Sequence, residues 1–379
     1  MVDKMSETSE TPIISVIIPF HNTENYIKES LDSVLNQTFK DIEVICINDK
    51  STDNSLSIVE KYAKKDGRIK IVNLDEKSGQ STARNRAMEI AKGKYISFID
   101  SDDRIDLDAY EKAYDFINEY DQDMVVFNAK RIDPYKKIIE SDLHQKAIPK
   151  EKIIETSIHQ HNELIYDTCV WNKLIKADFI RKNNFRFIDG RIYEDMLYSM
   201  QMYCSSKSVG VLPDVYYYWR IRRIEERSTT QKRTETKNIA DRVFITRKII
   251  ELFKSDEESE KLIEPLNDKL LDLDFKIYID KIHLGDEEYL RIVEEEMRPI
   301  VQNMDAKHFE SLSDYDRMKY DMLMKGELED LVNIIRKTSE EEAKIQKLNS
   351  LKTPKGLVKH LVKIMLPKKV IRKLKDIVY

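Results

Sequence analysis

Three aspartates within four positions give the clearest chemical signal in this sequence. Asp100, Asp102 and Asp103 follow residues 95–99, a short apolar and aromatic run that predicts a buried strand. Neighbouring carboxylates repel one another, so a cation, amide donors or water must offset their charge. Mg²⁺ and Mn²⁺ prefer oxygen ligands and leave positions open for phosphate oxygens. We therefore predict that Asp100 and Asp102 hold a divalent cation, which in turn holds a diphosphate.

The same acids also suit a purely structural role. Acidic side chains near the N-terminus of a helix accept hydrogen bonds from its unpaired amides and favour its dipole. A helix is predicted at residues 106–119, directly after these acids. The motif alone leaves both interpretations open, so the surrounding elements must decide between them.

Strands and helices are predicted to alternate around this motif. The apolar runs that predict strands lie at 13–18, 42–47, 69–72, 95–99 and 124–127. The stretches between them are long enough for crossover helices, which predicts an α/β fold with a mostly parallel sheet and flanking helices. The carboxyl ends of parallel strands meet at one edge of the sheet, where ligands usually bind. Asp49 and Asp102 should therefore face one crevice.

Composition agrees with a large and rather helical chain. The 379 residues are 41% hydrophobic and 35% charged, with only 8 Gly and 9 Pro, which favours helices and short loops. The cysteines, Cys46, Cys169 and Cys204, lack metal or redox spacing, which favours a reducing compartment. Residues 1–11 do not resemble a signal peptide, and no apolar run reaches about 18 residues. We therefore expect a cytoplasmic protein without a membrane span.

The last 28 residues differ in charge from the rest of the chain. Residues 352–379 hold eight lysines and one arginine against one acid, whereas the whole chain carries a net charge of −5. Apolar residues recur among these lysines at roughly helical spacing, which is typical of a segment lying on an anionic membrane surface. A terminal helix packed on the domain is the alternative. The basic charge is too local, and the body too acidic, to predict nucleic acid as a partner.

Seven motifs, in this order along residues 13–230, resemble glycosyltransferase family 2, whose members have the GT-A nucleotide-sugar fold. They are VIIPFHN (16–22), NDKSTDNS (48–55), SGQSTARN (78–85), YISFIDSDD (95–103), WNKL (171–174), YEDM (193–196) and YYYWRIR (216–222). The resemblance implies transfer of a sugar, usually with inversion, from a nucleotide-diphosphate donor to an acceptor hydroxyl. A UDP-sugar would be the most usual donor.

The resemblance also implies roles for individual residues. Those implied to bind the donor are Pro19, His21, Asn22, Glu24, Asp49, Arg84, Asp100 and Asp102. Within that set, Asp49 would contact the base, Arg84 would face the nucleotide, and Asp100 and Asp102 would hold Mn²⁺ or Mg²⁺. Asp195 matches the catalytic base. Trp171 and the aromatic run 216–219 could stack on sugar rings, although large aromatic residues more often belong to the core.

Three departures from similar sequences are visible. Lys50 and Ala87 stand where glycine is usual, and His21 replaces a common tyrosine. None of these changes removes a group that the chemistry needs.

The resemblance implies synthesis of a cell-surface polysaccharide or glycoconjugate on a glycan or lipid-linked acceptor, and the basic tail suits a location at the inner face of the membrane. Together with composition and pattern, it divides the chain into a disordered tail (1–12), a GT-A catalytic domain (13–230), a helical domain (231–351) and the basic amphipathic tail (352–379). Two alternatives stay open: a catalytically inactive nucleotide-sugar-binding interaction protein, and a nucleotidyltransferase on a related fold.

Overall fold

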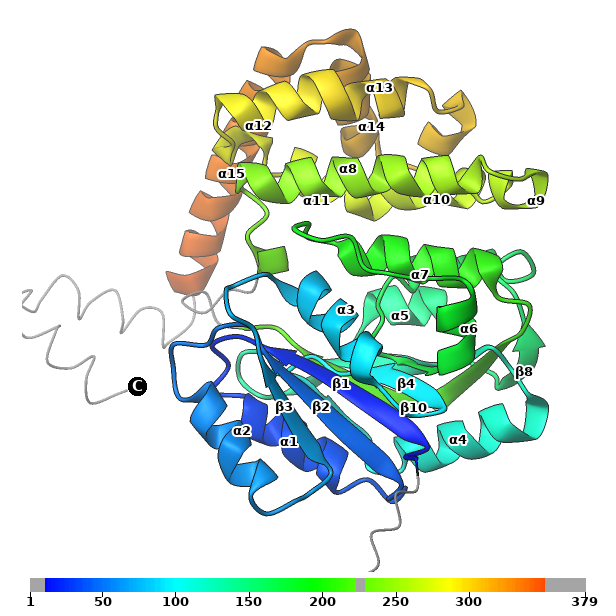
Figure 1. Cartoon of the computed structure of the whole chain (residues 1–379). Coiled ribbons are helices and arrows are strands. Elements are labelled where there is room, and N and C mark those ends of the chain that lie inside the picture. The colour runs from blue at the N-terminus through cyan, green and yellow to red at the C-terminus, as the bar shows by residue number, and fades with distance from the viewer. Residues whose placement is uncertain (1–10, 223–228, 352–379) are drawn as a thin grey trace, which may run out of the picture. The chain divides into compact units, whose positions relative to one another are not determined.

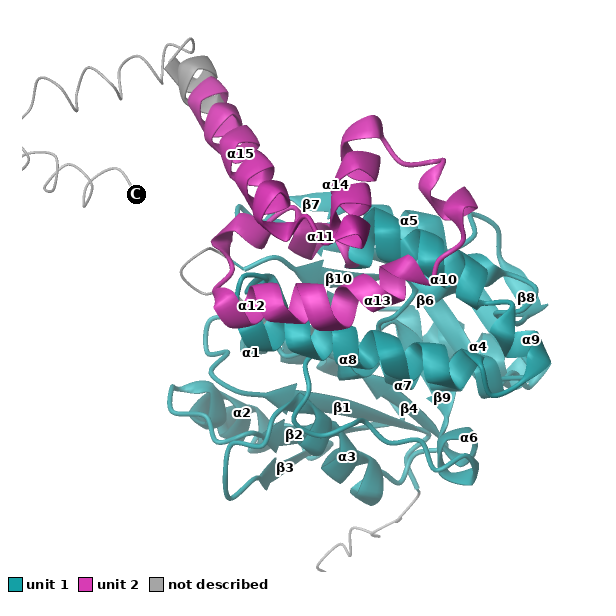
Figure 2. Cartoon of the chain, turned by 90° about the horizontal axis from the view of Figure 1, so that it is seen from above, with its two compact units in different colours: residues 1–274 teal, residues 275–379 magenta. Residues whose placement is uncertain are grey.

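The computed structural model describes residues 11–222 and 229–351, with side chains for all of these except 229 and 346–351. The chain divides into two compact units, residues 1–274 and 275–379, whose described parts are considered separately (Figure 2). Most of the predicted disordered tail and all of the predicted basic tail, residues 352–379, lie outside the described residues.

The first unit is built on one ten-stranded sheet, in which eight strands follow the order β3-β2-β1-β4-β9-β6-β10-β5. The strands are β1 (Ile14–Phe20), β2 (Ile42–Asn48), β3 (Ile69–Asn73), β4 (Tyr95–Phe98), β5 (Arg104–Ile105), β6 (Met124–Ile132), β7 (Ile138–Glu140), β8 (Ile153–Thr156), β9 (Lys173–Lys176) and β10 (Val209–Arg220). The parallel pairs β1–β2, β2–β3 and β1–β4 confirm the predicted arrangement. Every one of the seven residues of β1 and of β2 is buried, as expected for central strands covered on both faces.

The sheet is less parallel than the sequence predicts, because β5 and β8 pair antiparallel with β10, β7 pairs antiparallel with β6, and β9 is antiparallel to both of its neighbours. The short strand β9 runs antiparallel between β4 and β6, pairing Ile175 with both Ile96 and Met124. The fifth predicted strand is therefore not a direct neighbour of β4. It becomes the longer strand β6, which pairs in parallel with β10.

The first unit also contains helices, which cover both faces of the sheet or pack on other helices. They are α1 (Ile27–Leu35), α2 (Ser55–Ala63), α3 (Gln80–Ile90), α4 (Ala109–Tyr120), α5 (Asp142–Ala147), α6 (Ala177–Lys182), α7 (Glu194–Ser205), α8 (Thr236–Phe253), α9 (Glu257–Glu260) and α10 (Ile263–Lys269), with shorter turns η1 (Asn162–Tyr166), η3 (Thr229–Gln231) and η4 (Leu270–Asp274). Figure 1 shows α1, α2 and α4 on one face of the sheet and α3, α6 and α7 on the other. On α1, the apolar residues Ile27, Leu31 and Val34 recur at helical spacing and join the core beneath β1 and β2.

The second unit is helical. It contains α11 (Lys276–Ile279), η5 (Ile282–Leu284), α12 (Glu287–Ile292), η6 (Val293–Met297), α13 (Arg298–Gln302), η7 (Ala306–Phe309), α14 (Asp314–Lys325) and α15 (Leu328–Leu351). Tyr278, Tyr289 and Tyr320 are buried in its core. This confirms the predicted helical C-terminal region. Within the described residues, no helix combines the length and the apolar character needed to cross a membrane.

The division between the two units lies after Asp274, whereas the sequence predicts a boundary at 230/231. The reason is α8, which packs against α7 and so groups residues 231–274 with the sheet.

Candidate active site

The ends of β1 and β2 meet through His21 and Asp49. The backbone oxygen of Asp49 lies 2.7 Å from His21 Nδ1. The Asp49 carboxylate is buried and accepts hydrogen bonds from the amides of Ser78, at 2.6 Å, and Gly79, at 3.0 Å. Gly79 has a φ of +89°, a conformation that favours glycine, and it directly precedes α3. Asp49 thereby fixes the loop that leads into α3 beside the end of β1.

Two further residues of the predicted donor site hold the loop after β2. Asn22 Oδ1 accepts a hydrogen bond from the amide of Thr52 at 2.8 Å. Glu24 Oε2 accepts one from Asn54 Nδ2 at 2.6 Å and one from the Asn54 amide at 3.0 Å. Lys50 has a φ of +58°, which explains why glycine suits this position in similar loops. Pro19 is buried in β1 opposite Ile47.

Arg84 on α3 joins the two halves of the site. Its side chain is only 2% exposed. Nη2 donates to Asp100 Oδ1 at the end of β4, and Nη1 donates to Glu194 Oε1 at the start of α7, both at 2.7 Å. The neighbouring carboxylates raise the pKa of Arg84 further, although burial opposes them, so the guanidinium stays charged. Three elements that are distant in sequence therefore meet at one buried cation.

Asp195 follows Glu194 on α7 and is partly buried. Burial raises the pKa of the Asp195 carboxyl, the charge of Arg84 opposes this, and the charge of Asp100 raises it further. Burial also raises the pKa of Glu194 to about 7, despite the opposing charge of Arg84. Asp195 is thus close enough to Asp100 for their charges to interact. A carboxylate with a raised pKa is suited to general-base chemistry.

The three acids that follow β4 have three different environments. Asp100 pairs with Arg84, whereas Asp102 Oδ2 accepts a hydrogen bond from Arg222 Nε at 2.7 Å. Asp103 is buried and accepts from the hydroxyl of Tyr217 at 2.9 Å and the amide of Arg220 at 2.8 Å. Asp103 is therefore held by the fold, whereas Asp100 and Asp102 stay the predicted ligands of a cation.

The donor set fits a cation that takes most of its ligands from a diphosphate. Among the described residues, no group of three or more His, Cys, Asp and Glu side chains could hold a metal ion by itself. Asp102, with a side chain 14% exposed, and Asp100, 22% exposed, supply the carboxylate oxygens that Mg²⁺ and Mn²⁺ prefer. Arg222 already binds Asp102, so an ion there has to share or displace this guanidinium.

The predicted aromatic residues pack beneath the turn that carries the acids of residues 100–103. Trp171 is 7% exposed and stacks on Tyr217, with ring centroids 4.2 Å apart. The Tyr217 hydroxyl accepts from the amide of Asp100 at 3.0 Å while it contacts Asp103. Trp171 is therefore part of the core, and its contact with Tyr217 stabilises the turn that carries Asp100.

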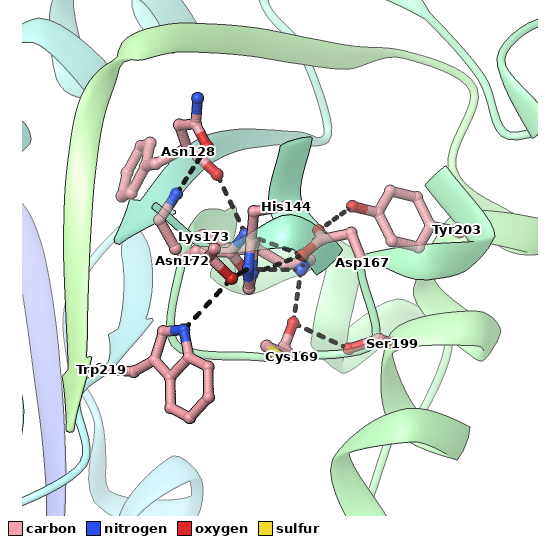
Figure 3. Close-up of polar contacts among 12 residues, drawn as sticks. Asn128, His144, Asp167, Cys169, Asn172, Lys173, Ser199, Tyr203 and Trp219 are labelled. Atoms are coloured by element: carbon pink, nitrogen blue, oxygen red, sulfur yellow. Dashed lines mark hydrogen bonds and ion pairs between the residues drawn. The ribbon is translucent and has the colours of Figure 1, made fainter. Parts of the chain in front are cut away.

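A buried charge network fixes the segment that carries Trp171 (Figure 3). Lys173 Nζ lies 2.5 Å from Asp167 Oδ2, and both side chains are fully buried. Asn172 and Tyr203 also donate to the Asp167 carboxylate. Ser199, one helical turn after Asp195 on α7, donates to the backbone oxygen of Cys169 at 3.0 Å. The WNKL motif therefore ties this segment to the helix that carries Asp195.

Two further groups of residues surround the site: the arginines of the YYYWRIR motif (216–222), and polar residues of α8, which lies outside the motifs. Arg220 and Arg222 at the end of β10 surround Asp102: Arg220 Nε donates to the Asp102 backbone oxygen at 2.8 Å, and its Nη2 to Glu29 at 2.7 Å. On α8, Asn238, Asp241 and Arg242 contact the segment immediately before Asp195. The only sequence signal for α8 was the presence of polar residues within a helical apolar pattern.

Comparison with known proteins agrees with the motifs. Residues 15–180 match the sequence profile of the family described as Glycosyl transferase family 2. A poly(ribitol-phosphate) beta-glucosyltransferase of Bacillus spizizenii is 35% identical over 216 residues, which are 55% of this chain and 32% of that protein. The putative glycosyltransferase EpsH of Bacillus subtilis is 34% identical over 56% of this chain and 62% of its own. This chain thus spans between about a third and three fifths of these two relatives.

A solved structure shares the fold. The crystal structure of residues 1–349 of TarS from S. aureus, in complex with UDP-GlcNAc, superposes with a TM-score of 0.69 at 22% identity. The match covers 87% of this chain and 92% of that one. It confirms the predicted GT-A architecture and extends past the sheet into the helical region.

Proposed function

We propose, because residues 15–180 match glycosyltransferase family 2, that this chain transfers a sugar from a nucleotide-diphosphate donor to an acceptor hydroxyl. The observation that carries the proposal is the buried Arg84, which joins Asp100 to Glu194 and so brings Asp195 to the acidic turn. The UDP-GlcNAc in the TarS structure supports a UDP-sugar as the donor. The poly(ribitol-phosphate) substrate named for one relative supports a cell-wall polymer as the acceptor.

We assign the nucleoside end of the donor to the loops after β1 and β2. Pro19, His21, Asn22, Glu24 and Asp49 lie on these loops or at the strand ends before them, and their hydrogen bonds fix the backbone there in advance. A pocket whose backbone is already ordered loses less entropy when it binds a ligand. Arg84 is held by two carboxylates, so we assign it to support of Asp100.

We assign a divalent cation, Mn²⁺ or Mg²⁺, to Asp102 with Asp100 beside it. Bound there, the ion would stabilise the charge that develops on the departing diphosphate. Arg222 donates to the same Asp102 oxygen and lies over the ring of Tyr26, 5.4 Å from its centroid. With an ion on this carboxylate, Arg222 would be available to the phosphate oxygens, which its planar donors suit.

Asp195 is assigned as the general base. The acceptor hydroxyl gives its proton to the Asp195 carboxylate as its oxygen forms the new bond to the anomeric carbon, and the bond to the diphosphate breaks with inversion. Positioned general bases contribute about 10²- to 10⁴-fold to a rate. Burial raises the pKa of Asp195, which strengthens it as a base as long as it stays ionised.

The decisive test is Asp195→Asn, with Asp178→Asn as the matched control. Asp178 is also an acid in the first turn of a helix, α6, but its side chain is 95% exposed. Release of UDP from a UDP-sugar in the presence of acceptor should fall at least 100-fold in Asp195→Asn, because the carboxamide cannot take the proton. The calorimetric affinity of Asp195→Asn for UDP with Mn²⁺ should stay within about twofold of the parent. In Asp178→Asn, both UDP release and UDP affinity should stay within about twofold of the parent.

Each alternative function gives a different result in this assay. Near-normal turnover in Asp195→Asn rejects the base assignment. Release of pyrophosphate from a nucleoside triphosphate would identify a nucleotidyltransferase. Tight UDP binding without release of UDP from any donor would identify a binding protein.

We also propose that the protein acts at the cytoplasmic face of the membrane, where the basic tail 352–379 would hold it near a lipid-linked or glycan acceptor. The support is the composition of the tail, which lies outside the described residues. Flotation with anionic liposomes tests this location. A chain that ends at Thr353 should lose binding, and equal binding by the shortened and the full chain would contradict the proposal.

A further inference from the structure

Helix α8 presents a buried polar face to the start of α7. Asn238, Asp241 and Arg242 are 1%, 1% and 7% exposed, and their spacing places them on one side of the helix. Figure 1 shows α8 lying alongside α7. The helix lies beyond residues 15–180, where the family profile matches, and beyond the catalytic domain predicted from the sequence. A buried polar face of this kind needs partners, since unpaired buried polar groups are costly.

The residues just before Asp195 are among the partners of this face. The Tyr193 hydroxyl donates to Asn238 Oδ1 at 2.8 Å. The guanidinium carbon of Arg242 lies 3.6 Å from the centroid of the Tyr193 ring. Asp241 accepts from the amide of Ile192 at 3.0 Å.

Asp241 also accepts from Arg191 Nη1 at 2.8 Å and from Lys237 Nζ at 2.7 Å. Three consecutive residues, 191–193, are therefore held by one helix.

The conformation of Tyr193 explains why such support is needed. Its φ is +68°, in the left-handed region that a bulky side chain rarely adopts. A residue held there costs about 1–3 kcal/mol and persists only where its surroundings impose it. Tyr193 is the residue that precedes α7, so its conformation sets the direction in which Glu194 and Asp195 leave the turn.

We propose that Asn238, Asp241 and Arg242 are positioning residues, which hold the turn at 191–193 and thereby direct the Asp195 carboxylate toward the acceptor. This inference rests on the proposed function of Asp195 as the base. On this proposal, α8 contributes to the active site by holding the turn at 191–193, and none of its side chains needs to contact a substrate.

Arg242 adds an electrostatic effect to this positioning. Its charge lowers the pKa of Asp195, against the effect of burial. The charged and titratable groups that face Asp195 are Arg84 on α3, Asp100 after β4, Glu194 on α7, Arg242 on α8 and Cys169 in the segment before β9. Removing Arg242 takes away one of the two cations in this set, so Asp195 should hold its proton to a higher pH.

The test compares Tyr193→Phe, Asn238→Ala and Arg242→Met with Thr246→Val. Thr246 is equally buried on α8, and its hydroxyl has no hydrogen-bond partner among the described residues, which makes it a matched control. The kcat for sugar transfer should fall about 10- to 100-fold in the first three variants, because small displacements of a reacting group have effects of this size. Calorimetric affinity for UDP with Mn²⁺ should stay within about twofold of the parent. Thr246→Val should be unchanged in both measurements.

Arg242→Met should also move the acidic limb of the pH–kcat profile to higher pH, whereas Tyr193→Phe should lower kcat without this shift. A merely structural role would not separate the two variants in this way. Asp274 pairs with Lys269 at 2.5 Å as well as with Arg242, so it keeps a partner in Arg242→Met.

Three outcomes would overturn the inference. The first is an unchanged kcat in the folded Tyr193→Phe and Asn238→Ala proteins. The others are a loss of UDP affinity as large as the loss of kcat, or a fall of kcat in Thr246→Val as large as in the other variants. Asp195→Asn is measured in parallel. If Asp195→Asn transfers sugar normally, the proposed function itself fails and the inference with it. If Asp195→Asn is inactive while the α8 variants are normal, only the role of α8 is rejected.

Discussion

Arg84 Nη1 lies 2.7 Å from Glu194 Oε1, although 110 positions separate the two residues in the chain. The second nitrogen of the same guanidinium lies 2.7 Å from Asp100. One buried cation therefore holds together the end of β4 and the start of α7. The first two predictions below follow from this arrangement.

Loss of Arg84 should destabilise the fold far more than loss of its neighbour Arg86. Arg84→Met leaves Asp100 and Glu194 without their shared cation, and breaking a buried pair in this way costs about 3–5 kcal/mol. Arg86 lies on the same helix but pairs with Glu89 at the surface, with a side chain 55% exposed, so Arg86→Met should cost less than about 1 kcal/mol. Urea unfolding of both variants measures the difference. Similar values for the two would contradict a central role for Arg84.

Stability should decrease between pH 4.5 and about 7 because of Glu194. Burial raises the pKa of this carboxyl from its ordinary 4.5 to about 7 in the folded protein. Within that window the unfolded chain has released a proton that the folded chain retains, so raising the pH favours unfolding. Above about pH 7 the effect of this group is constant.

The measurement is the free energy of unfolding of the parent minus that of Glu194→Gln, across pH 4.5 to 8. This difference should fall as pH rises to about 7 and then level off. The same subtraction with Glu257→Gln, an exposed acid in the first turn of α9, should give a flat line. A difference that rises with pH would contradict the environment found for Glu194.

Asp102→Asn should abolish the metal-dependent part of donor binding. A carboxamide is a far poorer ligand than a carboxylate for Mn²⁺ or Mg²⁺. Calorimetry with UDP should show Kd rising at least tenfold in the presence of Mn²⁺, and little change with EDTA. Asp108→Asn removes an exposed carboxylate a short distance along the chain and should bind like the parent.

Arg222→Gln removes the guanidinium that binds Asp102 but leaves the Asp102 carboxylate in place. It therefore tests the metal assignment separately from the role of Arg222. This variant should keep the response of UDP affinity to Mn²⁺, because Asp102 is intact. If Asp102→Asn responds to Mn²⁺ as the parent does, the assignment of the ion to Asp102 is wrong.

Trp171→Ala should act on stability rather than on recognition of the acceptor. Truncation of a buried tryptophan costs about 3–5 kcal/mol, and here it also removes the ring against which Tyr217 packs. Trp171→Phe should recover part of this loss. Thermal or urea unfolding checks both variants. A large rise in acceptor KM without loss of stability would instead indicate that Trp171 binds a sugar.

The sequence predicted the parts of the fold that depend on local pattern. The apolar runs at 13–18 and 42–47 became β1 and β2, because their length and β-branched content suit buried strands. Asp49 and Asp100 follow the carboxyl ends of β2 and β4, which are both parallel to β1. Strand β9 was missed as a neighbour of β4, since four residues carry too little pattern to specify a partner or a direction.

The pairings between distant residues were less predictable. Arg222 and Asp102 are separated by 120 positions, and the local sequence around either residue does not indicate its partner. Arg84 was expected to face the nucleotide. The structure pairs it with two carboxylates, and its contact with a nucleotide stays a prediction. The polar residues of α8 were overlooked because a helical pattern reveals which positions are buried, but not what they meet.

The span of these contacts also bears on how the protein is made. The contacts around Asp195 draw on residues from Arg84 on α3 to Arg242 on α8. Pairings so far apart along the chain form late and slowly, because each must first close a long loop. On the ribosome, the nascent sheet would be complete before the helix that supports Tyr193 has emerged. The growing polypeptide should therefore acquire its shape before it acquires any ability to react.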